Sequence, residues 1–266
     1  MHGGPSFKAL SASTLGLTLS LSLSVGCGRQ DSPPAAGPQG KPKQEDTRIL
    51  ETGAEALQSF EPVSALDVYI DGFHAMKDHP SHTMEAHHFC RAGNEEFMQC
   101  VIFDANTTNA NMVGIEYIIS ERLYETLSPE ERLLWHPHNF EILSGQLVAP
   151  GLPDVAEHAF LEKKINSYGK TWHTWDTEAP EQKTLPLGPP MLAWSFNADK
   201  ELDPLVVQER DKRMNLDSAR KREGRQDMIP KAHPQGGVHA LAPAFPGRVV
   251  PSYVKDRDAP DADAGP

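Results

Sequence analysis

Cysteine is scarce in this sequence, with only three among 266 residues. Three cysteines cannot build the dense disulfide framework of small secreted scaffolds, so the fold must depend on a hydrophobic core. The chain length and the hydrophobic fraction of 38% are sufficient for such a core. Internal repeats, which would indicate a solenoid, are also missing.

Several signatures of nucleotide binding and catalysis do not occur either. The glycine-rich patterns GxGxxG and GxxxxGK[ST], which cradle phosphates, are absent. The GxSxG turn that exposes a nucleophilic serine is absent, as are the zinc spacings HExxH and paired CxxC. The sequence therefore offers no standard motif for a phosphate site, a serine hydrolase or a zinc site.

Basic residues are too few for a nucleic-acid-binding protein. The chain has 25 of them against 37 acidic residues, a net charge of -12. Lys8 is the only charged residue before Cys27, so the chain from Cys27 onward carries 24 basic and 37 acidic residues, or -13. Phosphate binding depends on neutralisation by lysine and arginine, which excludes nucleic acid as the expected partner.

The first 26 residues have the pattern of a lipoprotein signal peptide. Lys8 precedes an uncharged, leucine- and serine-rich stretch that is too short and too weakly apolar for a membrane span. Small residues then lead to Cys27, as in bacterial lipoproteins, where this cysteine is acylated. Leu23 and Ser24 are displaced from the usual pattern, so an ordinary cleaved secretory signal remains the alternative.

Two segments have the composition of disordered chain. Residues 27–46 and 230–266 are rich in proline, glycine and alanine and lack periodic apolar positions, which predicts a flexible tether and a disordered or loosely draped tail. Gly28 is not the aspartate associated with inner-membrane retention. We therefore expect a cell-envelope protein that is lipid-anchored through Cys27 in the outer membrane and faces the periplasm.

Residues 47–229 read as a single domain of the α+β class. Apolar runs and alternation predict strands at 97–103, 112–119, 140–148, 170–176 and 191–196, with the first two forming a hairpin. Helical spacing and capping residues predict helices at 47–62, 64–76, 120–127, 130–135, 155–168, 202–214 and 217–225. The last two are charged and are expected on the surface. These elements predict a mainly antiparallel sheet that helices cover on one face.

Histidine and cysteine concentrate between His79 and Cys100, a stretch that holds four of the twelve histidines and two of the three cysteines. A helix over residues 84–91 would place His87 and Cys90 on one face, whereas an extended chain would pair His88 with Cys90. Cys90 and Cys100 are either a disulfide or two buried thiols. The sequence leaves both choices open.

Other candidate ligands lie further along the chain. His136 and His138 flank a proline that favours extended backbone, so their imidazoles should point to the same side. His173 projects from an expected strand, and Glu116 shares a strand face with Gly114 and Ile118. Glu116 would act as a ligand, as a partner that orients an imidazole, or as a general base.

Together these residues suggest a site for zinc or another transition metal. The candidate ligands are His87, His88, Cys90, His136, His138 and His173. Two alternatives remain, a buried hydrogen-bonded network and histidines scattered over the surface.

The chain from about residue 64 to 209 resembles the oil body-associated protein family, a conserved domain of unknown function found in plant seeds, bacteria and fungi. The resemblance is carried in order by the segments EAHHFC (85–90), GIEYIIS (114–120), LLWHPH (133–138), VAPG (148–151), YGKTWHTW (168–175) and LPLG (185–188). It implies no reaction and no cofactor. The plant members associate with lipid bodies, but the export signal and tether seen here do not fit that location, and the family's cytosolic members make a required disulfide less expected.

Two functions are therefore expected. The first is a membrane-tethered envelope lipoprotein whose domain binds a lipid, a small-molecule ligand or a partner without turning it over. The second is a metal-dependent enzyme that uses the histidines, with Glu116 as general base.

Overall fold

Seven strands form the centre of the protein in a computed structural model, which describes Met1 and residues 31–258. The strands are β1 (Val68–Met76), β2 (His79–Asn94), β3 (Phe97–Phe103), β4 (Met112–Ile119), β5 (His136–Pro137), β6 (Tyr168–His173) and β7 (Met191–Ser195). All pairings are antiparallel, in the order β4-β3-β2-β1-β7-β6-β5. The predicted α+β class and antiparallel sheet are confirmed.

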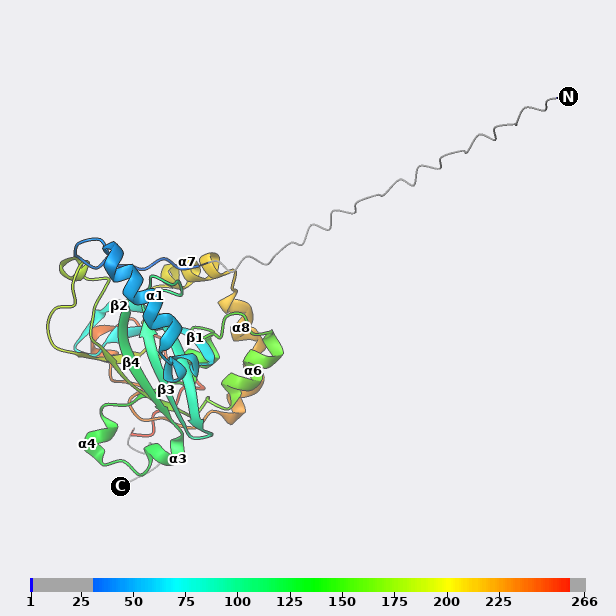
Figure 1. The fold of residues 1–266 in the computed structure, drawn as a ribbon. Helices are drawn as coiled ribbons and strands as arrows, with labels where there is room; N and C mark the ends of the chain where they lie inside the picture. The colour runs from blue at the N-terminus through cyan, green and yellow to red at the C-terminus, as the bar shows by residue number, and fades with distance from the viewer. Residues whose placement is uncertain (2–30, 259–266) are drawn as a thin grey trace, which may run out of the picture.

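The sheet closes on itself, because β4 also pairs with β6 from Gly114↔His173 to Ile119↔Tyr168. Six strands therefore form a ring, with β5 added alongside β6. Figure 1 labels β1, β2, β3 and β4 of this ring. Side chains alternate along each strand, so every second residue points into the ring. The predicted arrangement, a sheet with helices on one face, is corrected to a closed sheet with an interior of its own.

The hairpin β3–β4 was predicted correctly. Both strands begin and end where the apolar runs do, and Val101 lies opposite Ile115. The strand predicted at 191–196 appears as β7, and the one at 170–176 appears as β6, which begins earlier, at Tyr168.

The segment before the hairpin differs from its prediction. Residues 64–76 were expected to be helical, but β1 occupies Val68–Met76 and only the short helix α2 (Glu61–Ser64) precedes it. The histidine-rich stretch is the long strand β2, which settles the open choice in favour of extended backbone. Cys90 and Cys100 lie opposite each other on β2 and β3 and form a disulfide, contrary to what the resemblance implied.

Helices fill the connections. They are α1 (Glu45–Leu57), α3 (Glu121–Tyr124), α4 (Pro129–Arg132), α5 (Asn139–Ser144), α6 (Asp154–Glu162), α7 (Pro204–Met214) and α8 (Ser218–Gly224), with 3-10 turns at Pro180–Gln182, Gln226–Lys231 and Ala242–Ala244. The predicted strand at 140–148 is wrong, because α5 occupies this position and all six of its residues are buried. Because its polar residues Asn139, Glu141 and Ser144 are buried along with its apolar ones, the sequence of α5 lacks the amphipathic period of a surface helix.

Helices α7 and α8 were expected to be charged surface helices, yet several of their charges are buried. Arg210 is 0% exposed and donates to Asp71 Oδ1 at 2.7 Å. Lys221 pairs with the buried Glu157, and the buried Arg225, just after α8, donates to the carbonyl of Ile142 at 2.6 Å. These side chains attach the two helices to the body of the molecule.

The predicted tail contributes to the packed molecule as far as residue 258. Val238 and Leu241 are 1% and 2% exposed, and Gln235 is fully buried. The predicted tether also contacts the domain. The Ser32 amide donates to Asn106 Oδ1 at 2.9 Å, and the Gly37 amide donates a hydrogen bond to the carbonyl of Lys183. Residues on both sides of the predicted domain therefore contact it, whereas the signal peptide and Cys27 lie outside the described residues.

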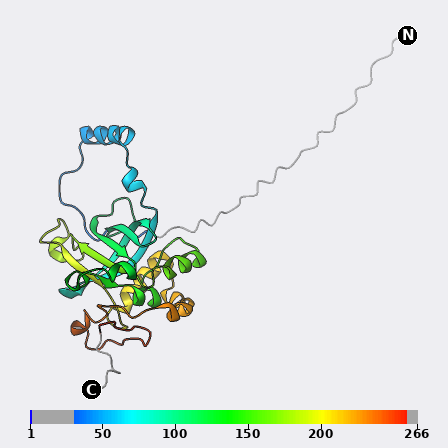
Figure 2. The same ribbon diagram turned by 90° about the horizontal axis from the view of Figure 1, so that it is seen from below.

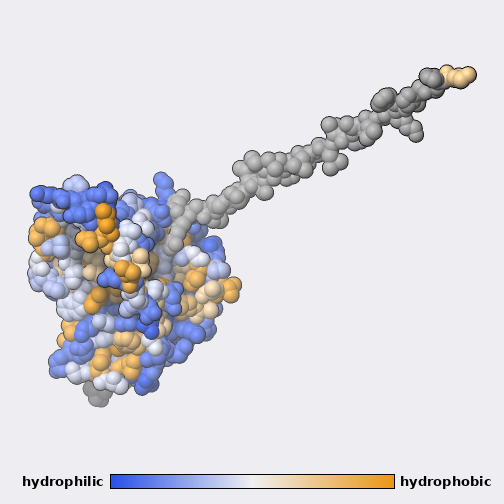
Figure 3. Space-filling model, in the orientation of Figure 1, coloured by the Kyte–Doolittle hydropathy of each residue, from blue (hydrophilic) through white to orange (hydrophobic). Residues whose placement is uncertain are grey.

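Helix α1 has no buried residue and stands apart from the ring, most clearly in Figure 2. Ile49, Leu50 and Leu57 on this helix are 64%, 73% and 89% exposed. Figure 3 shows orange apolar patches among blue on the face that α1 crosses. Within residues 31–258, no helix has both the length and the apolarity to cross a bilayer.

Candidate histidine–glutamate site

The interior of the ring holds a cluster of five histidines around one glutamate. Four members project inward from strands, namely His74 on β1, His88 on β2, Glu116 on β4 and His173 on β6. The register brings two of them close, because His173 lies opposite Gly114, which shares the inward face of β4 with Glu116. No member of the cluster is more than 3% exposed.

The two carboxylate oxygens of Glu116 face different histidines. Oε2 lies 2.8 Å from His88 Nε2 and 4.0 Å from His74 Nε2. Oε1 lies 3.3 Å from His138 Nε2 and 3.5 Å from His136 Nε2. Every one of these imidazoles therefore presents its Nε2 atom to the carboxylate.

His136 and His138 reach the cluster past Gly169. His136 lies on β5 opposite Gly169, and His138 caps α5, so that their Nε2 atoms are 3.2 Å apart. A Cβ atom at position 169 would lie 2.1 Å from Glu116 Oε1 and 2.6 Å from each of the two Nε2 atoms. Only glycine leaves room for this approach.

Ser167 fixes the tautomer of His138. The Ser167 hydroxyl donates its single proton to the carbonyl of Lys164 at 2.6 Å, so it must accept from His138 Nδ1, 2.8 Å away. When His138 is neutral, its Nε2 therefore carries a lone pair directed at Glu116. A lone pair facing a carboxylate is stable only with a proton or a cation between them.

His173 stands behind His74 in a similar way, with its Nε2 atom 3.1 Å from His74 Nδ1. If His74 donates from Nδ1, its Nε2 lone pair is directed at Glu116. Within residues 31–258, the Nδ1 atoms of His88, His136 and His173 are buried without a hydrogen-bond partner. The cluster therefore has more nitrogen atoms than its own hydrogen bonds satisfy.

Burial sets the charge of the cluster. Desolvation, with neighbouring His88, lowers the pKa of His74 well below its ordinary value of 6.5, and desolvation likewise lowers that of His173 to about 4. Burial alone would raise the pKa of Glu116, but hydrogen bonds with the imidazoles outweigh it and hold this pKa well below 4.5. Glu116 is thus a carboxylate in a largely neutral imidazole shell.

The predicted tail supports the site. The Gln235 side chain accepts from the Asn139 amide at 3.0 Å and donates to the carbonyl of Ser167 at 2.9 Å. It therefore joins the segment that carries His138 to the segment that carries its partner Ser167.

The structure brings together most, but not all, of the predicted site residues. Glu116, His88, His136, His138 and His173 meet inside the ring. Cys90 does not join them because it is disulfide-bonded, and His87 points to the opposite face of β2 from His88. Prediction missed His74, which was assigned to a helix. The β-branched and aromatic residues Val68, Tyr69, Ile70 and Phe73 around it were the available strand signal.

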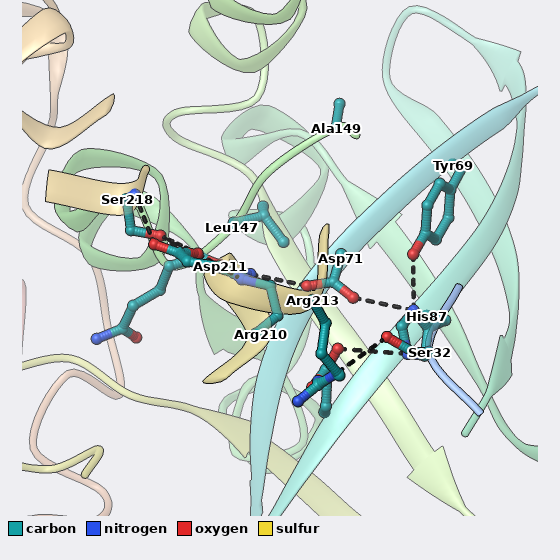
Figure 4. Close-up of polar contacts among 12 residues, drawn as sticks. Ser32, Tyr69, Asp71, His87, Leu147, Ala149, Arg210, Asp211, Arg213 and Ser218 are labelled. Carbon is teal, nitrogen blue, oxygen red and sulfur yellow. Dashed lines mark hydrogen bonds and ion pairs between the residues drawn. The ribbon is translucent and has the colours of Figure 1, made fainter. Parts of the chain in front are cut away.

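His87 belongs to a separate polar network on the outer side of β1 and β2, shown in Figure 4. Its Nδ1 atom lies 3.0 Å from Asp71 Oδ2 and 2.7 Å from the Tyr69 hydroxyl. Asp71 also accepts from Arg210, and Glu85, whose Oε1 is 3.5 Å from His87 Nε2, pairs with Arg213. Because the two arginines already neutralise both carboxylates, we assign this network a structural role.

Each half of the interior cluster has the residues of a metal site. His74, His88 and Glu116 form one group and Glu116, His136 and His138 form another, with the ligand atoms of each group within 4.8 Å of one another. Imidazole nitrogen and carboxylate oxygen are ligands for zinc, copper, iron and nickel. The geometry is therefore suited to holding a transition metal.

Comparison with known proteins identifies relatives along most of the chain. Residues 60–229 match the family described as protein of unknown function (DUF1264). The chain is 37% identical over 203 residues to oil body-associated protein 1B of Arabidopsis thaliana, covering 76% of this chain and 82% of that protein. It is 36% identical over 221 residues to oil body-associated protein 1A of Zea mays, covering 83% and 90%. No solved structure matches this chain.

Proposed function

We propose that this chain, which belongs to the oil body-associated protein family (DUF1264), is a metalloprotein that binds a transition metal at its interior histidine–glutamate cluster. The observation that carries the proposal is the convergence of imidazole Nε2 atoms on both oxygens of a buried carboxylate. A cation bound between these atoms would satisfy together Oε1 and the two Nε2 atoms, 3.2 Å apart, that face it.

The geometry favours Glu116 as a ligand over the general base suggested by the sequence. Both of its oxygens already contact imidazole nitrogens, and its side chain is 3% exposed. A general base needs an oxygen within reach of a substrate proton. We therefore propose metal binding as the activity and assign no reaction to the site.

Elemental analysis tests the proposal. We expect the full-length protein, purified without a histidine tag and refolded with zinc, copper or iron, to retain stoichiometric metal after dialysis. Glu116→Gln keeps the side-chain volume but removes the charge, so it should weaken metal binding by about 100-fold or more. His82→Gln is the matched control, because His82 lies on the same strand as His88 but pairs with Asp176 at the surface.

The structural network predicts a different outcome. Folded protein, verified by circular dichroism, that retains no metal under any of these conditions would overturn the proposal. A loss of stability in Glu116→Gln under those conditions would then identify the cluster as a hydrogen-bonded core.

Association with a lipid surface is a second candidate function, favoured by α1. The relatives are named as oil body-associated proteins. In this chain, α1 presents Ile49, Leu50 and Leu57 to solvent, and it begins eighteen residues after the proposed anchor Cys27. We propose that acylated Cys27 tethers the chain to a membrane and that the apolar side of α1 rests on the lipid, which would also bury its exposed apolar area.

Fractionation of cells that express the full chain tests the tether. We expect wild-type protein in the membrane fraction and Cys27→Ser in the soluble fraction, because a single helix face binds lipid weakly without an acyl chain. If Cys27→Ser remains in the membrane fraction and is released only by adding Leu50→Glu and Leu57→Glu, then α1 is the anchor. Val155→Glu, an exposed apolar position on α6, is the matched control. Retention of all variants would contradict both contacts.

A further inference from the structure

We infer that the cluster is a dinuclear centre, with two metal ions bridged by the carboxylate of Glu116. This inference rests on the proposed function and specifies how many ions the site holds. Two groups of ligands meet at Glu116 and share no other residue, one made by His74 and His88 and one by His136 and His138.

The first argument is the division of the ligands between the two oxygens. His88 approaches Oε2 at 2.8 Å, whereas His138 and His136 approach Oε1 at 3.3 and 3.5 Å. A carboxylate that uses one oxygen for each ion holds the two ions about 3.5–4 Å apart, the separation found in two-metal sites.

The second argument concerns ligand spacing within one group. The Nε2 atoms of His136 and His138 are 3.2 Å apart, and both lie within 3.5 Å of Glu116 Oε1. Tetrahedral zinc with bonds of about 2.0–2.1 Å separates neighbouring ligand atoms by roughly 3.3 Å. The three atoms are therefore already spaced for one ion, with His74 and His88 left for another.

The third argument is that each group has its own outer partner. Ser167 accepts from Nδ1 of His138, and His173 places its Nε2 3.1 Å from Nδ1 of His74. Metal-binding histidines almost always donate their second ring N–H to such a partner, which fixes the tautomer and orients the ring. Within residues 31–258, the Nδ1 atoms of His88 and His136 lack one, so this argument applies to one histidine of each group. His173, predicted from the sequence to be a ligand, is therefore a positioning residue in this arrangement.

The absence of a side chain at Gly169 lets the three potential ligand atoms of the Oε1 end lie close to β6. Gly169 faces Glu116 Oε1 and the two Nε2 atoms with no side chain of its own. This corner is bounded by backbone on one side and by three potential ligand atoms on the other.

Metal stoichiometry of the untagged full chain, loaded with cobalt(II), tests the inference. We expect two ions per chain in the wild type, with magnetic coupling between them visible by electron paramagnetic resonance. His136→Gln/His138→Gln should retain one ion at the Oε2 end, and His74→Gln/His88→Gln should retain one at the Oε1 end. Both double variants should lose the coupling.

The outcomes separate this inference from the function on which it rests. One uncoupled ion in the wild type would overturn the dinuclear centre and leave the metalloprotein standing, whereas no bound ion would overturn both. If a double variant fails to fold, the wild-type stoichiometry and coupling decide the question alone. His173→Gln adds a test of positioning, since a ligand role predicts loss of an ion, whereas a positioning role predicts two ions bound about 10–100-fold more weakly.

Discussion

At the scale of single residues, the site depends on which face of a strand each side chain occupies. His87 and His88 are neighbours in the sequence but point to opposite faces of β2, one towards Asp71 and the other towards Glu116. Alternation along an extended strand causes this separation. The histidine pair that was most conspicuous in the sequence therefore contributes only one residue to the cluster.

Gly169 shows how strongly one position limits the site. Gly169→Ala would place a methyl group against Glu116 Oε1 and the imidazoles of His136 and His138, and the backbone of β6 cannot easily move away. We expect this change to reduce the free energy of unfolding by about 1–3 kcal/mol and to abolish metal retention at the Oε1 end. Urea denaturation and elemental analysis measure the two effects.

Gly224→Ala is the control for this prediction, because a Cβ atom at position 224 meets nothing within 4 Å. It should be neutral or slightly stabilising. Wild-type stability and metal content in Gly169→Ala would show that the cluster is not packed as the structure describes.

At the scale of elements, the outer network joins β1 and β2 to α7. Asp71 on β1 accepts from Arg210 on α7, while His87 and Glu85 on β2 face Asp71 and Arg213. Burial disfavours the charged form of His87, but the negative charges of Asp71 and Glu85 outweigh it and raise the pKa of His87 above 6.5. Burial would raise the pKa of Asp71, yet His87 and Arg210 lower it below 3.8.

These two pKa shifts define the pH range in which the network stabilises the folded protein. The raised pKa of His87 means that its contribution to stability is complete below about pH 6.5 and is lost as the pH rises through the folded-state pKa. The contribution of Asp71 is complete above about pH 3.8 and is lost as the pH falls through its lowered pKa. The network is therefore most stabilising between these two values.

His87→Gln tests this linkage. The difference in unfolding free energy between wild type and His87→Gln should be largest between about pH 4 and 6.5, and it should shrink as the pH rises further. Urea denaturation of both proteins at matched pH values measures it, and titrations elsewhere in the molecule cancel in the difference. A difference that does not change with pH would mean that His87 has the same pKa in the folded and the unfolded protein.

At the scale of the whole molecule, local patterns predicted some elements and missed the closure. Residues 97–103 and 112–119 were predicted correctly because each is a short apolar run bounded by turn residues. The choice between helix and strand was left open for β2 because its inward face carries His88 as well as Met84 and Ala86, and a polar residue in the core interrupts the hydrophobic alternation. Helix α5 was mistaken for a strand because it is buried on all sides.

The cluster itself was predicted only in part, because local sequence patterns do not show which distant strands pair. Sequence spacing indicated that His136 and His138 point to one side and that Glu116 shares the face of Gly114. The meeting of these residues with His74 and His88 depends on the β4–β6 pairing, which joins strands about fifty residues apart in the chain. Such a long-range contact leaves no local signal in one sequence. Gln235 was missed because the composition around it is typical of disordered chain.

Closure of the sheet also has a kinetic consequence. Neighbouring strands of the ring are hydrogen-bonded to each other, and the cluster residues His136 and His173 are 0% exposed. Ions bound there would exchange with solvent only when the surrounding structure opens. The least extensive pairings are that of β5, which carries His136, with β6 (two residue pairs) and those of β7 with β1 and β6 (three residue pairs each). Loss of metal to a chelator would then proceed at the rate of this local opening, independent of chelator concentration.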